Sequence, residues 1–415
     1  MYRLPIGRLS RRSYPVVAAL CLAGIACTGA CGKTLPLGAT AASLDAGDAF
    51  GGAGAVVSIC AGEAFTCAAM AAGDVRCWGD NTNGVLGVPP AMVPRSPLAV
   101  VVPGLPHDVV DVVCADLAVC ARRASGVVLC WGNNGFGTVG DNGSQDASEI
   151  QLPTELPLAN VTALAAEAAD MCALDASGSV SCWGQDVDGE VGDGTLKPDD
   201  RTPTRTVGVT NALAVAGGAG FACATRTDRT AACWGADTRG ELGDVGAAGS
   251  AASTPIALVG VSGIRQIALT SFAGCALLED GSVSCWGDNS RGQLGRGTSS
   301  GSLFPPAWVP GLSDVVSVGT GGAVVCAVRM DRRTFCWGGN ADGELGLGIV
   351  EDPVSTPTEL LTLPDALLVA GGLSHTCAMT VDHETWCWGA NDKGQLGIGS
   401  VGVSISTPTK VVFSQ

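Results

Sequence analysis

Fourteen cysteines form the most regular chemical pattern in the sequence. Seven of them begin the tripeptide Cys-Trp-Gly, and each of these has a partner ten residues upstream that is followed by Ala. Paired thiols at a fixed short spacing can form a disulfide, hold a metal or stay reduced inside a core. The pairs are Cys67 and Cys77, Cys120 and Cys130, Cys172 and Cys182, Cys223 and Cys233, Cys275 and Cys285, Cys326 and Cys336, and Cys377 and Cys387.

A disulfide within each pair is the interpretation that the spacing favours. Ten residues that span a turn place two cysteines opposite one another on adjacent antiparallel strands. We expect the Cα atoms of each pair to lie about 4.4 to 6.8 Å apart. Buried, reduced thiols are the alternative, since Cys is among the most buried residue types. Zinc is disfavoured, because a tetrahedral site needs three or four converging ligands and each repeat offers two Cys and no repeating His.

Five cysteines, Cys21, Cys27, Cys31, Cys60 and Cys114, lie outside this pattern. Cys60 and Cys114 occupy nearly equivalent places in adjacent repeats, so they form either a disulfide between repeats or two single buried thiols. Ala precedes both Cys27 and Cys31, after four Arg and an apolar run over residues 16–26. This layout is typical of a secretory signal, and the small residue before Cys resembles the processing site of bacterial lipoproteins. We predict lipid attachment at Cys31, with Cys27 as the alternative, because cleavage at Cys31 leaves 16 other cysteines, an even number that can pair.

The remaining reactive residue types do not form a catalytic constellation. The three His, His107, His375 and His383, are dispersed along the chain. Both Tyr, Tyr2 and Tyr14, lie in the predicted signal, which excludes the Tyr nucleophile that sialidases use. We expect His375 to be packed or hydrogen-bonded and the other two His to be solvated. The sequence therefore predicts no enzyme activity and no cofactor.

Two acidic turns, at residues 186–190 and 340–344, have oxygen side chains on alternate positions before Gly, as calcium loops do. An EF-hand loop would also need a bidentate Glu at its twelfth position. The same turn recurs in the other repeats with Asn and Ser in these places, so we interpret the acids as turn-capping residues and predict no metal site.

The elements that position these residues recur about every 51 residues, with a Gly-x-(Leu/Val)-Gly turn after each Trp-Gly. Each unit is interpreted as four short strands. In the fifth unit these are residues 264–269, 275–278 and 283–286, with Asp-Gly turn chemistry between the last two, and a strand near the Pro segment. Seven such units predict an all-β fold, a seven-bladed β-propeller of four-stranded antiparallel blades, because closing a ring removes unpaired sheet edges. The seven Trp are expected in the core between blades.

The predicted organisation is a signal peptide with a lipoprotein-type processing site over 1–31, a flexible linker over 32–54 and the propeller over 55–415. We expect the strand near 407–412 to pair near 56–59 and seal the ring. The repeats cover approximately 55–107, 108–159, 160–210, 211–262, 263–313, 314–365 and 366–415.

The charge balance excludes one class of partner. The formal net charge is −16, and removal of the four Arg of the signal gives 19 − 39 = −20. Such a surface repels phosphate backbones, so we expect no nucleic acid partner.

The pattern Ala-Gly-Gly-x-x-His-Thr-Cys-Ala-Met, Cys-Trp-Gly-Ala-Asn-Asp-Lys-Gly-Gln-Leu-Gly and Thr-Pro-Thr, over 370–409, resembles the regulator of chromosome condensation repeat. The resemblance covers roughly residues 55 to 415 and implies a seven-bladed propeller. In that family the founding activity is nucleotide exchange on the GTPase Ran, with chromatin binding by basic tails. This chain has no basic tail, is strongly acidic and begins with a predicted export signal, so the resemblance implies the fold and not that activity.

The sequence therefore predicts an exported, lipid-anchored, monomeric scaffold that binds an unknown envelope or extracellular protein through variable loops. Its place is the outer membrane, the periplasm or the exterior, with the lipid as the only membrane contact. The alternatives are an exchange factor and a carbohydrate-active or carbohydrate-binding propeller. The loops are at 89–97, 141–154, 194–202 and 297–306, and Trp308, outside the repeated Trp positions, is the candidate binding anchor.

Overall fold

The computed structural model describes residues 54–143, 150–244, 249–301 and 303–413. These residues form strands and turns and contain no helix. The predicted signal peptide, the linker up to residue 53, and the processing sites Cys27 and Cys31 lie outside the described residues.

The strands assemble into seven four-stranded antiparallel sheets, each built from four consecutive strands. Blades 1 to 4 consist of β1 (Val56–Ala61), β2 (Phe65–Met70), β3 (Val75–Asp80) and β4 (Arg95–Val101); β5 (Val109–Cys114), β6 (Ala118–Arg123), β7 (Val128–Asn133) and β8 (Ile150–Glu155); β9 (Val161–Glu167), β10 (Asp170–Asp175), β11 (Val180–Gln185) and β12 (Asp199–Arg205); and β13 (Ala212–Gly218), β14 (Phe221–Arg226), β15 (Ala231–Gly235) and β16 (Ala252–Ala257). Blades 5 to 7 consist of β17 (Ile264–Leu269), β18 (Ala273–Leu278), β19 (Val283–Gly287) and β20 (Phe304–Trp308); β21 (Val315–Gly321), β22 (Val324–Arg329), β23 (Thr334–Gly338) and β24 (Val354–Glu359); and β25 (Ala366–Gly371), β26 (His375–Thr380), β27 (Thr385–Gly389) and β28 (Ile405–Lys410).

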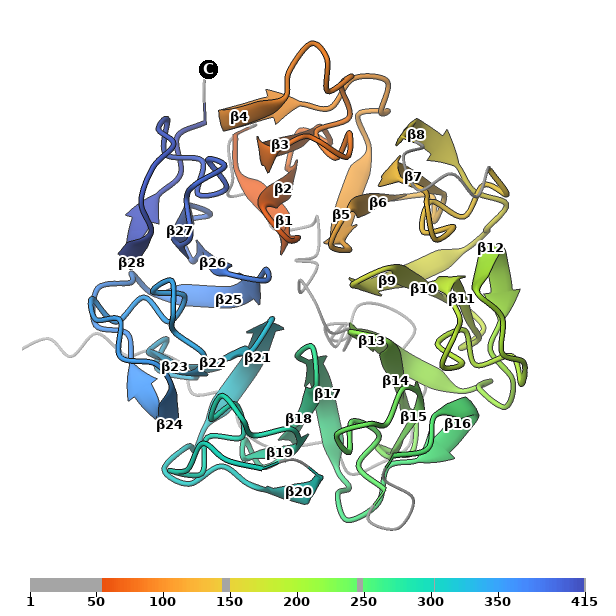
Figure 1. Cartoon of the computed structure of the whole chain (residues 1–415), viewed down its shortest axis with the longest axis vertical. Coiled ribbons are helices and arrows are strands. Elements are labelled where there is room, and N and C mark those ends of the chain that lie inside the picture. Colours follow the sequence, from red (N-terminus) through yellow and green to blue (C-terminus); the bar gives the residue numbers. More distant parts are fainter. Residues whose placement is uncertain (1–53, 144–149, 245–248, 302, 414–415) are drawn as a thin grey trace, which may run out of the picture. The chain divides into compact units, whose positions relative to one another are not determined.

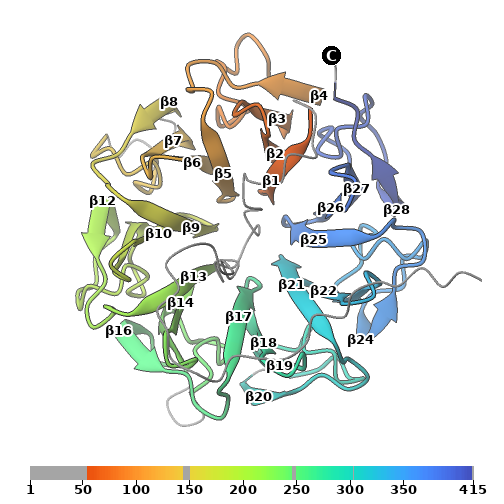
Figure 2. The ribbon, with the colours of Figure 1, turned by 180° about the vertical axis from the view of Figure 1, so that it is seen from behind.

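The sheets stand around a central axis as the blades of a seven-bladed β-propeller (Figure 1). The first strand of each blade lies nearest the axis, and the same order is seen from behind (Figure 2). The prediction of an all-β, seven-bladed propeller is confirmed.

The predicted hairpin of blade 5 shows how local sequence sets the strands. Between β18 and β19, Gly281 adopts a φ of +80°, a conformation that residues with a Cβ rarely take. The Asp280 carboxylate accepts the backbone N–H of Ser282 at 2.9 Å and fixes the turn. The Asp-Gly pair therefore turns the chain and brings Cys275 opposite Cys285.

The repeated Trp residues join each blade to its neighbour. Each is fully buried, and its indole N–H donates to the backbone carbonyl of the x residue in the Gly-x-(Leu/Val)-Gly turn of the adjacent blade. The donors and acceptors are Trp78 and Gln395, Trp131 and Val85, Trp183 and Thr138, Trp234 and Glu190, Trp286 and Glu241, Trp337 and Gln293, and Trp388 and Glu344, at 2.7 to 2.9 Å.

The expectation that the carboxyl-terminal strand pairs near residues 56–59 is wrong. β28 is the outer strand of blade 7 and pairs with β27, whereas β1 is the inner strand of blade 1 and pairs with β2. The seven repeats are complete units, so no strand is left over to exchange. Blades 7 and 1 are joined instead by hydrogen bonds between them, such as Trp78 Nε1 to the Gln395 carbonyl, Thr66 Oγ1 to His375 Nε2 (2.8 Å) and Gly399 N to the Pro97 carbonyl (2.9 Å).

Candidate functional site

The first and third connections of every blade lie at the same end of the sheet, because the four strands are antiparallel. Backbone hydrogen bonds tie the two connections together, as from Asp80 N to the Ala64 carbonyl (2.9 Å) in blade 1 and from Asp288 N to the Phe272 carbonyl (3.0 Å) in blade 5. We call this end of the propeller the loop face. It carries the four variable segments singled out in the sequence.

A cavity of about 290 Å³ opens on the loop face where blades 7, 1 and 2 meet. Glu63 from the β1–β2 connection, Asp80 from the end of β3 and Asp116 from the β5–β6 connection contribute three carboxylates to its lining. Lys393, from the β27–β28 connection, contributes the one basic side chain of that lining. Phe65 provides an apolar wall. The cavity thus carries excess negative charge.

The carboxylates of this cavity differ in how they are held. Asp80 accepts the backbone N–H of Thr82 at 3.1 Å and also contacts the Thr82 hydroxyl. None of the three, Glu63, Asp80 or Asp116, forms an ion pair within the described part of the chain. Burial, and then the nearby charge of Glu63, raise the pKa of Asp116 to about 6. A cationic group placed in the cavity would lower this pKa, because a nearby positive charge favours the ionised carboxylate.

Two further acids continue this charge into blade 3. Asp170, at the start of β10, is 3% exposed, and burial raises the pKa of its carboxyl well above the usual range, with added repulsion from Glu190 and Asp116. Glu190 is buried in the Gly-rich turn of the same blade, where its carboxylate accepts the N–H of Asp188 at 2.8 Å. The acidic patch, defined as Glu63, Asp80, Asp116, Asp170 and Glu190, therefore crosses three blades.

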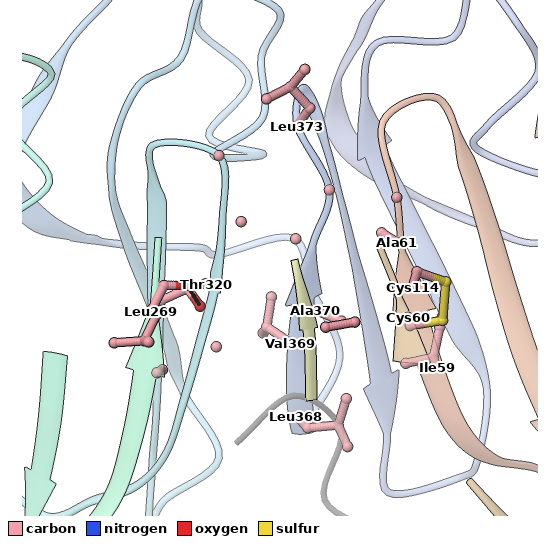
Figure 3. Close-up of a pocket in the computed structure, with 18 of the residues that line it drawn as sticks. Ile59, Cys60, Ala61, Cys114, Leu269, Thr320, Leu368, Val369, Ala370 and Leu373 are labelled. Atoms are coloured by element: carbon pink, nitrogen blue, oxygen red, sulfur yellow. Dashed lines mark hydrogen bonds between the residues drawn. A yellow bond between two sulfur atoms is a disulfide. The ribbon is translucent and has the colours of Figure 1, made fainter. Parts of the chain in front are cut away.

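The central channel holds a second, smaller cavity of about 60 Å³ (Figure 3). Inner strands line it with small and apolar residues, including Ile59, Leu269, Val369 and Ala370, and the Thr320 hydroxyl donates to the Leu269 carbonyl at 2.6 Å. This volume holds a few water molecules but not a drug-sized ligand. The cavity on the loop face is therefore the better candidate site.

The structure brings the two cysteines of every predicted pair together. In the seven pairs within blades, the two residues face each other across the second and third strands with Cα atoms 4.0 to 4.1 Å apart. This is slightly below the expected range of about 4.4 to 6.8 Å. A directly opposed antiparallel pair without backbone hydrogen bonds has Cα atoms only about 4.5 Å apart, which accounts for the shorter distance.

Cys60 and Cys114 also lie together, with Cα atoms 5.5 Å apart, and their side chains join β1 to β5 beside the channel (Figure 3). Both are inner-strand residues and are 6% and 8% exposed, respectively. The sequence left open a disulfide between repeats or two single buried thiols, and the structure pairs Cys60 with Cys114 between blades 1 and 2.

The His residues lie apart, as the sequence indicates. His375 is 1% exposed, and burial lowers its pKa to about 4, so it is neutral at physiological pH. His107 is exposed in the β4–β5 connection, and His383 is half-buried in the β26–β27 turn.

The two calcium-like turns use their acids on the backbone. Asp186 accepts the Val191 N–H at 3.1 Å, and Glu344 accepts the Asp342 N–H at 2.8 Å. Within the described ranges, no group of three or more His, Cys, Asp or Glu is placed to hold a metal ion. The same part of the chain has no long apolar helix of the kind that spans a membrane.

Trp308 is 73% exposed but is not in a loop, because it is the last residue of the outer strand β20 of blade 5. It is absent from the lining of both cavities. Its role as a binding anchor stays a prediction.

Sequence reasoning missed the acidic patch, although the repeat held a signal for it. Asp170 stands two residues before the first Cys of its pair, where other blades have Phe, Ala, Val or His. A carboxylate at a core position of a repeat is not required for packing, and it therefore indicates a functional site.

The model of the RCC1-like domain matches residues 101–415, and the model of the regulator of chromosome condensation (RCC1) repeat matches residues 56–85. Among curated proteins, E3 ubiquitin-protein ligase HERC2 of Mus musculus is 30% identical over 371 residues, which cover 85% of this chain and 7% of that protein. The chain thus spans a small part of this relative. Ultraviolet-B receptor UVR8 of Arabidopsis thaliana is 28% identical over 346 residues, 80% of this chain and 76% of the receptor.

Two solved structures share the fold. Prp20p of Saccharomyces cerevisiae superposes with a TM-score of 0.73 at 22% identity, covering 82% of this chain and 86% of that one. Human WBSCR16 superposes with a TM-score of 0.70 at 23% identity, covering 79% and 87%. At these identities the likeness concerns the fold alone.

Proposed function

Because the chain belongs to the family of the RCC1-like domain, we propose that it is a non-catalytic propeller that binds a protein partner through the loop face. The observation that carries this proposal is the cavity lined by Glu63, Asp80 and Asp116, none of which forms an ion pair among the described residues. Loops held on a rigid ring are where binding residues are usually placed.

The chemistry of the cavity selects a partner with basic side chains. A Lys or Arg side chain that enters would meet more carboxylates than ammonium groups. The formal net charge of −16 would attract such a partner from a distance and speed its association. Protein binding by relatives supports the proposal: Prp20p has binding properties to Gsp1p and histones, and Kap60 binds yeast RCC1.

The proposed setting is outside the cytoplasm, with a lipid on Cys31, or on Cys27, as the only membrane attachment. Eight cysteine pairs at disulfide distance support this setting, since disulfides persist in oxidising compartments. Metabolic labelling with a fatty acid would test it, because label lost in Cys31→Ser and retained in Cys27→Ser places the lipid at Cys31. A full chain that takes up no label contradicts lipid attachment.

Affinity enrichment from cell-envelope extract tests the binding proposal. The full protein is compared with a Glu63→Gln/Asp116→Asn variant and with an Asp365→Asn/Asp382→Asn control, whose two exposed acids lie at the opposite end of blade 7. The proposal expects a partner that is retained by the wild type and the control, lost from the cavity variant, and displaced by a lysine-rich peptide. A partner retained equally by all three proteins contradicts it.

A further inference from the structure

One residue holds the Gly-rich turn of every blade. It lies a few residues after the repeated Trp, and its Oδ1 accepts the backbone N–H five residues further on. Five blades use Asn here, and the amide Nδ2 can also donate across the connection, as Asn134 does to Asp141 Oδ1 at 2.8 Å. Two blades use Asp, which has no such donor when ionised. The seven residues are Asn81, Asn134, Asp186, Asp237, Asn289, Asn340 and Asn391.

Blade 4 places two carboxyl groups where blade 2 has an amide and a carboxylate. Asp237 and Asp244 are seven residues apart, as are Asn134 and Asp141. Asp237 is 1% exposed. Its Oδ2 and the Oδ1 of Asp244 are buried and have no hydrogen-bond donor. The two groups are close enough for a hydrogen bond when one of them carries a proton.

Blade 3 shows how the chain can neutralise acids at these positions. There Asp193, the counterpart of Asp244, accepts the Lys197 ammonium at 2.9 Å, and this ammonium also reaches Asp200 at 3.1 Å. Blade 4 has no counterpart of this Lys among its described residues, and the charged groups that act most strongly on Asp237 are the acids Asp244 and Glu241.

The nearest basic side chain of the same turn is committed elsewhere. Arg239 lies over the Phe272 ring, 4.1 Å from its centroid, with its Nη1 3.6 Å from Asp288 of blade 5. Glu241 is likewise engaged, since its Oε2 accepts the Arg239 N–H at 2.6 Å. A buried pair of carboxylates without a cation is strongly unfavourable unless one of them is protonated.

We propose that Asp237 and Asp244 share one proton, and that this proton fixes residues 237–244 of the loop face in the way that the Asn134 amide fixes blade 2. The O–H of one carboxyl replaces the amide N–H as the donor, and the carboxylate of the other accepts it. When the proton leaves, the two negative charges repel each other and the turn loosens. This inference is independent of the proposed binding function.

The direction of the pH effect follows from burial. Burial, with repulsion from Asp244 and Glu241, raises the pKa of Asp237 to about 7, whereas Leu242 N–H, donating to Oδ1 at 3.0 Å, opposes the rise. A pKa that is higher in the folded than in the unfolded chain stabilises the fold at low pH. The stabilisation declines as pH rises from about 4 and is lost as pH passes about 7.

The test measures chemical unfolding of the full propeller at about pH 5 and about pH 8 for wild type, Asp237→Asn and the exposed control Asp382→Asn. We expect the unfolding equilibrium constant of the wild type to rise about tenfold or more relative to Asp237→Asn between the two pH values. The control should follow the wild type. After correction for the base-catalysed intrinsic rate of hydrogen exchange, the protection of peptide 237–244 should fall on the same change of pH in the wild type only.

Three results would overturn the inference. One is a ratio of unfolding constants between wild type and Asp237→Asn that does not change with pH. Another is millimolar calcium that slows exchange of peptide 237–244 at pH 8 in the wild type but not in Asp237→Asn, which would place a cation where we place a proton. If Asp237→Asn fails to fold, infrared spectroscopy of the wild type and of Asp244→Asn replaces it. The intensity of the protonated-carboxyl band must fall more between pH 5 and pH 8 in the wild type than in Asp244→Asn, and an equal fall would overturn the inference.

Discussion

The indole N–H of Trp78 donates to the backbone carbonyl of Gln395, 317 positions further along the chain, at 2.9 Å. The same bond joins blades that are consecutive in sequence, as between Trp388 and Glu344 at 2.7 Å. The junction of blades 7 and 1 is therefore built like the other six, although no peptide connection crosses it. Its stability depends on non-covalent contacts, which include a backbone hydrogen bond from Gly399 N to the Pro97 carbonyl at 2.9 Å.

The first prediction concerns the hydroxyl of Thr66, which lies at the junction of blades 7 and 1. Thr66 is fully buried and donates its one proton to the Gln395 carbonyl at 2.9 Å, so it must accept its 2.8 Å hydrogen bond from His375 Nε2. We expect Thr66→Val to lower the free energy of unfolding by about 2 to 3 kcal/mol, because it removes a donor and leaves a buried imidazole N–H unpaired.

Thr376→Val is the matched control for this change. Thr376 occupies the equivalent place in blade 7 and donates to the Glu344 carbonyl at 2.8 Å. Among the described residues, no His ring forms a hydrogen bond with the Thr376 hydroxyl. Its loss should cost about 1 to 2 kcal/mol in the same urea titration. Equal costs for the two variants would show that His375 adds nothing to the closure.

The cysteine pair between blades should stabilise the fold more than a pair within a blade. Cys60 and Cys114 are 54 residues apart, whereas Cys275 and Cys285 are 10 apart. On the loop-entropy model the longer loop contributes about 4 kcal/mol and the shorter about 3. The two double Ala variants, compared by denaturant unfolding after mass spectrometry has verified the remaining disulfides, should differ in this order. A larger loss for Cys275→Ala/Cys285→Ala would refute the ranking.

Asp111 makes a pH-dependent contribution to the stability of the fold at the junction of blades 1 and 2. It is 5% exposed, accepts the Ser58 hydroxyl at 2.9 Å and lies 3.6 Å from Arg122. Burial raises its pKa to about 6, against the lowering effect of Arg122 and Ser58. Its protonation therefore favours the folded state, and this contribution disappears as pH rises from about 4 through 6.

The change to Asn isolates this effect of Asp111. Relative to Asp111→Asn, the wild type should lose up to about 3 kcal/mol of stability between pH 4 and pH 7. Unfolding free energies of both proteins at the two pH values give the result. A difference between the proteins that grows in favour of the wild type with rising pH would have the wrong sign.

Trp308 lies at the end of blade 5 opposite the loop face, where it pairs with Ser284 near the start of β19. Its side chain is 73% exposed, and surface substitutions usually change stability by less than about 0.5 kcal/mol. We therefore expect Trp308→Ser to unfold as the wild type does and to bind a loop-face partner with unchanged affinity. Weaker binding by Trp308→Ser would place Trp308 in the interface and extend that interface beyond the loop face.

The blades and cysteine pairs were predictable because each is fixed by local, repeated chemistry. Asp280-Gly281 makes the turn that pairs Cys275 with Cys285, and this holds whatever the rest of the chain does. How the ring closes was not predictable. The pattern ends at a complete repeat, and the contact between Trp78 and Gln395 requires knowledge of which residues meet after the chain has gone full circle.

The acidic patch could not be predicted for a related reason. Glu63 and Asp116 come from connections of blades 1 and 2, Asp170 comes from the start of β10 in blade 3, and the three are far apart in the sequence. Only the curvature of the ring brings them to one place. Asp170 is the one carboxylate at its core position of the repeat, and Asp186 and Asp237 are the two Asp residues at a position that is Asn in the other five blades. Departures from the repeat were therefore the part of the sequence that pointed to the site.

The affinity of the cavity for a basic segment tests the central claim most directly. A fluorescently labelled, lysine-rich peptide is titrated with the wild type, Glu63→Gln/Asp116→Asn and the control Asp365→Asn/Asp382→Asn at low and physiological salt. The account predicts that the cavity variant binds about five- to thirtyfold more weakly, or ~1 to 2 kcal/mol for two partly buried charges. It also predicts that wild-type affinity rises from pH 5 to 7 as Asp116, whose pKa is raised to about 6, ionises. Equal affinity of the cavity variant and the control would contradict the account.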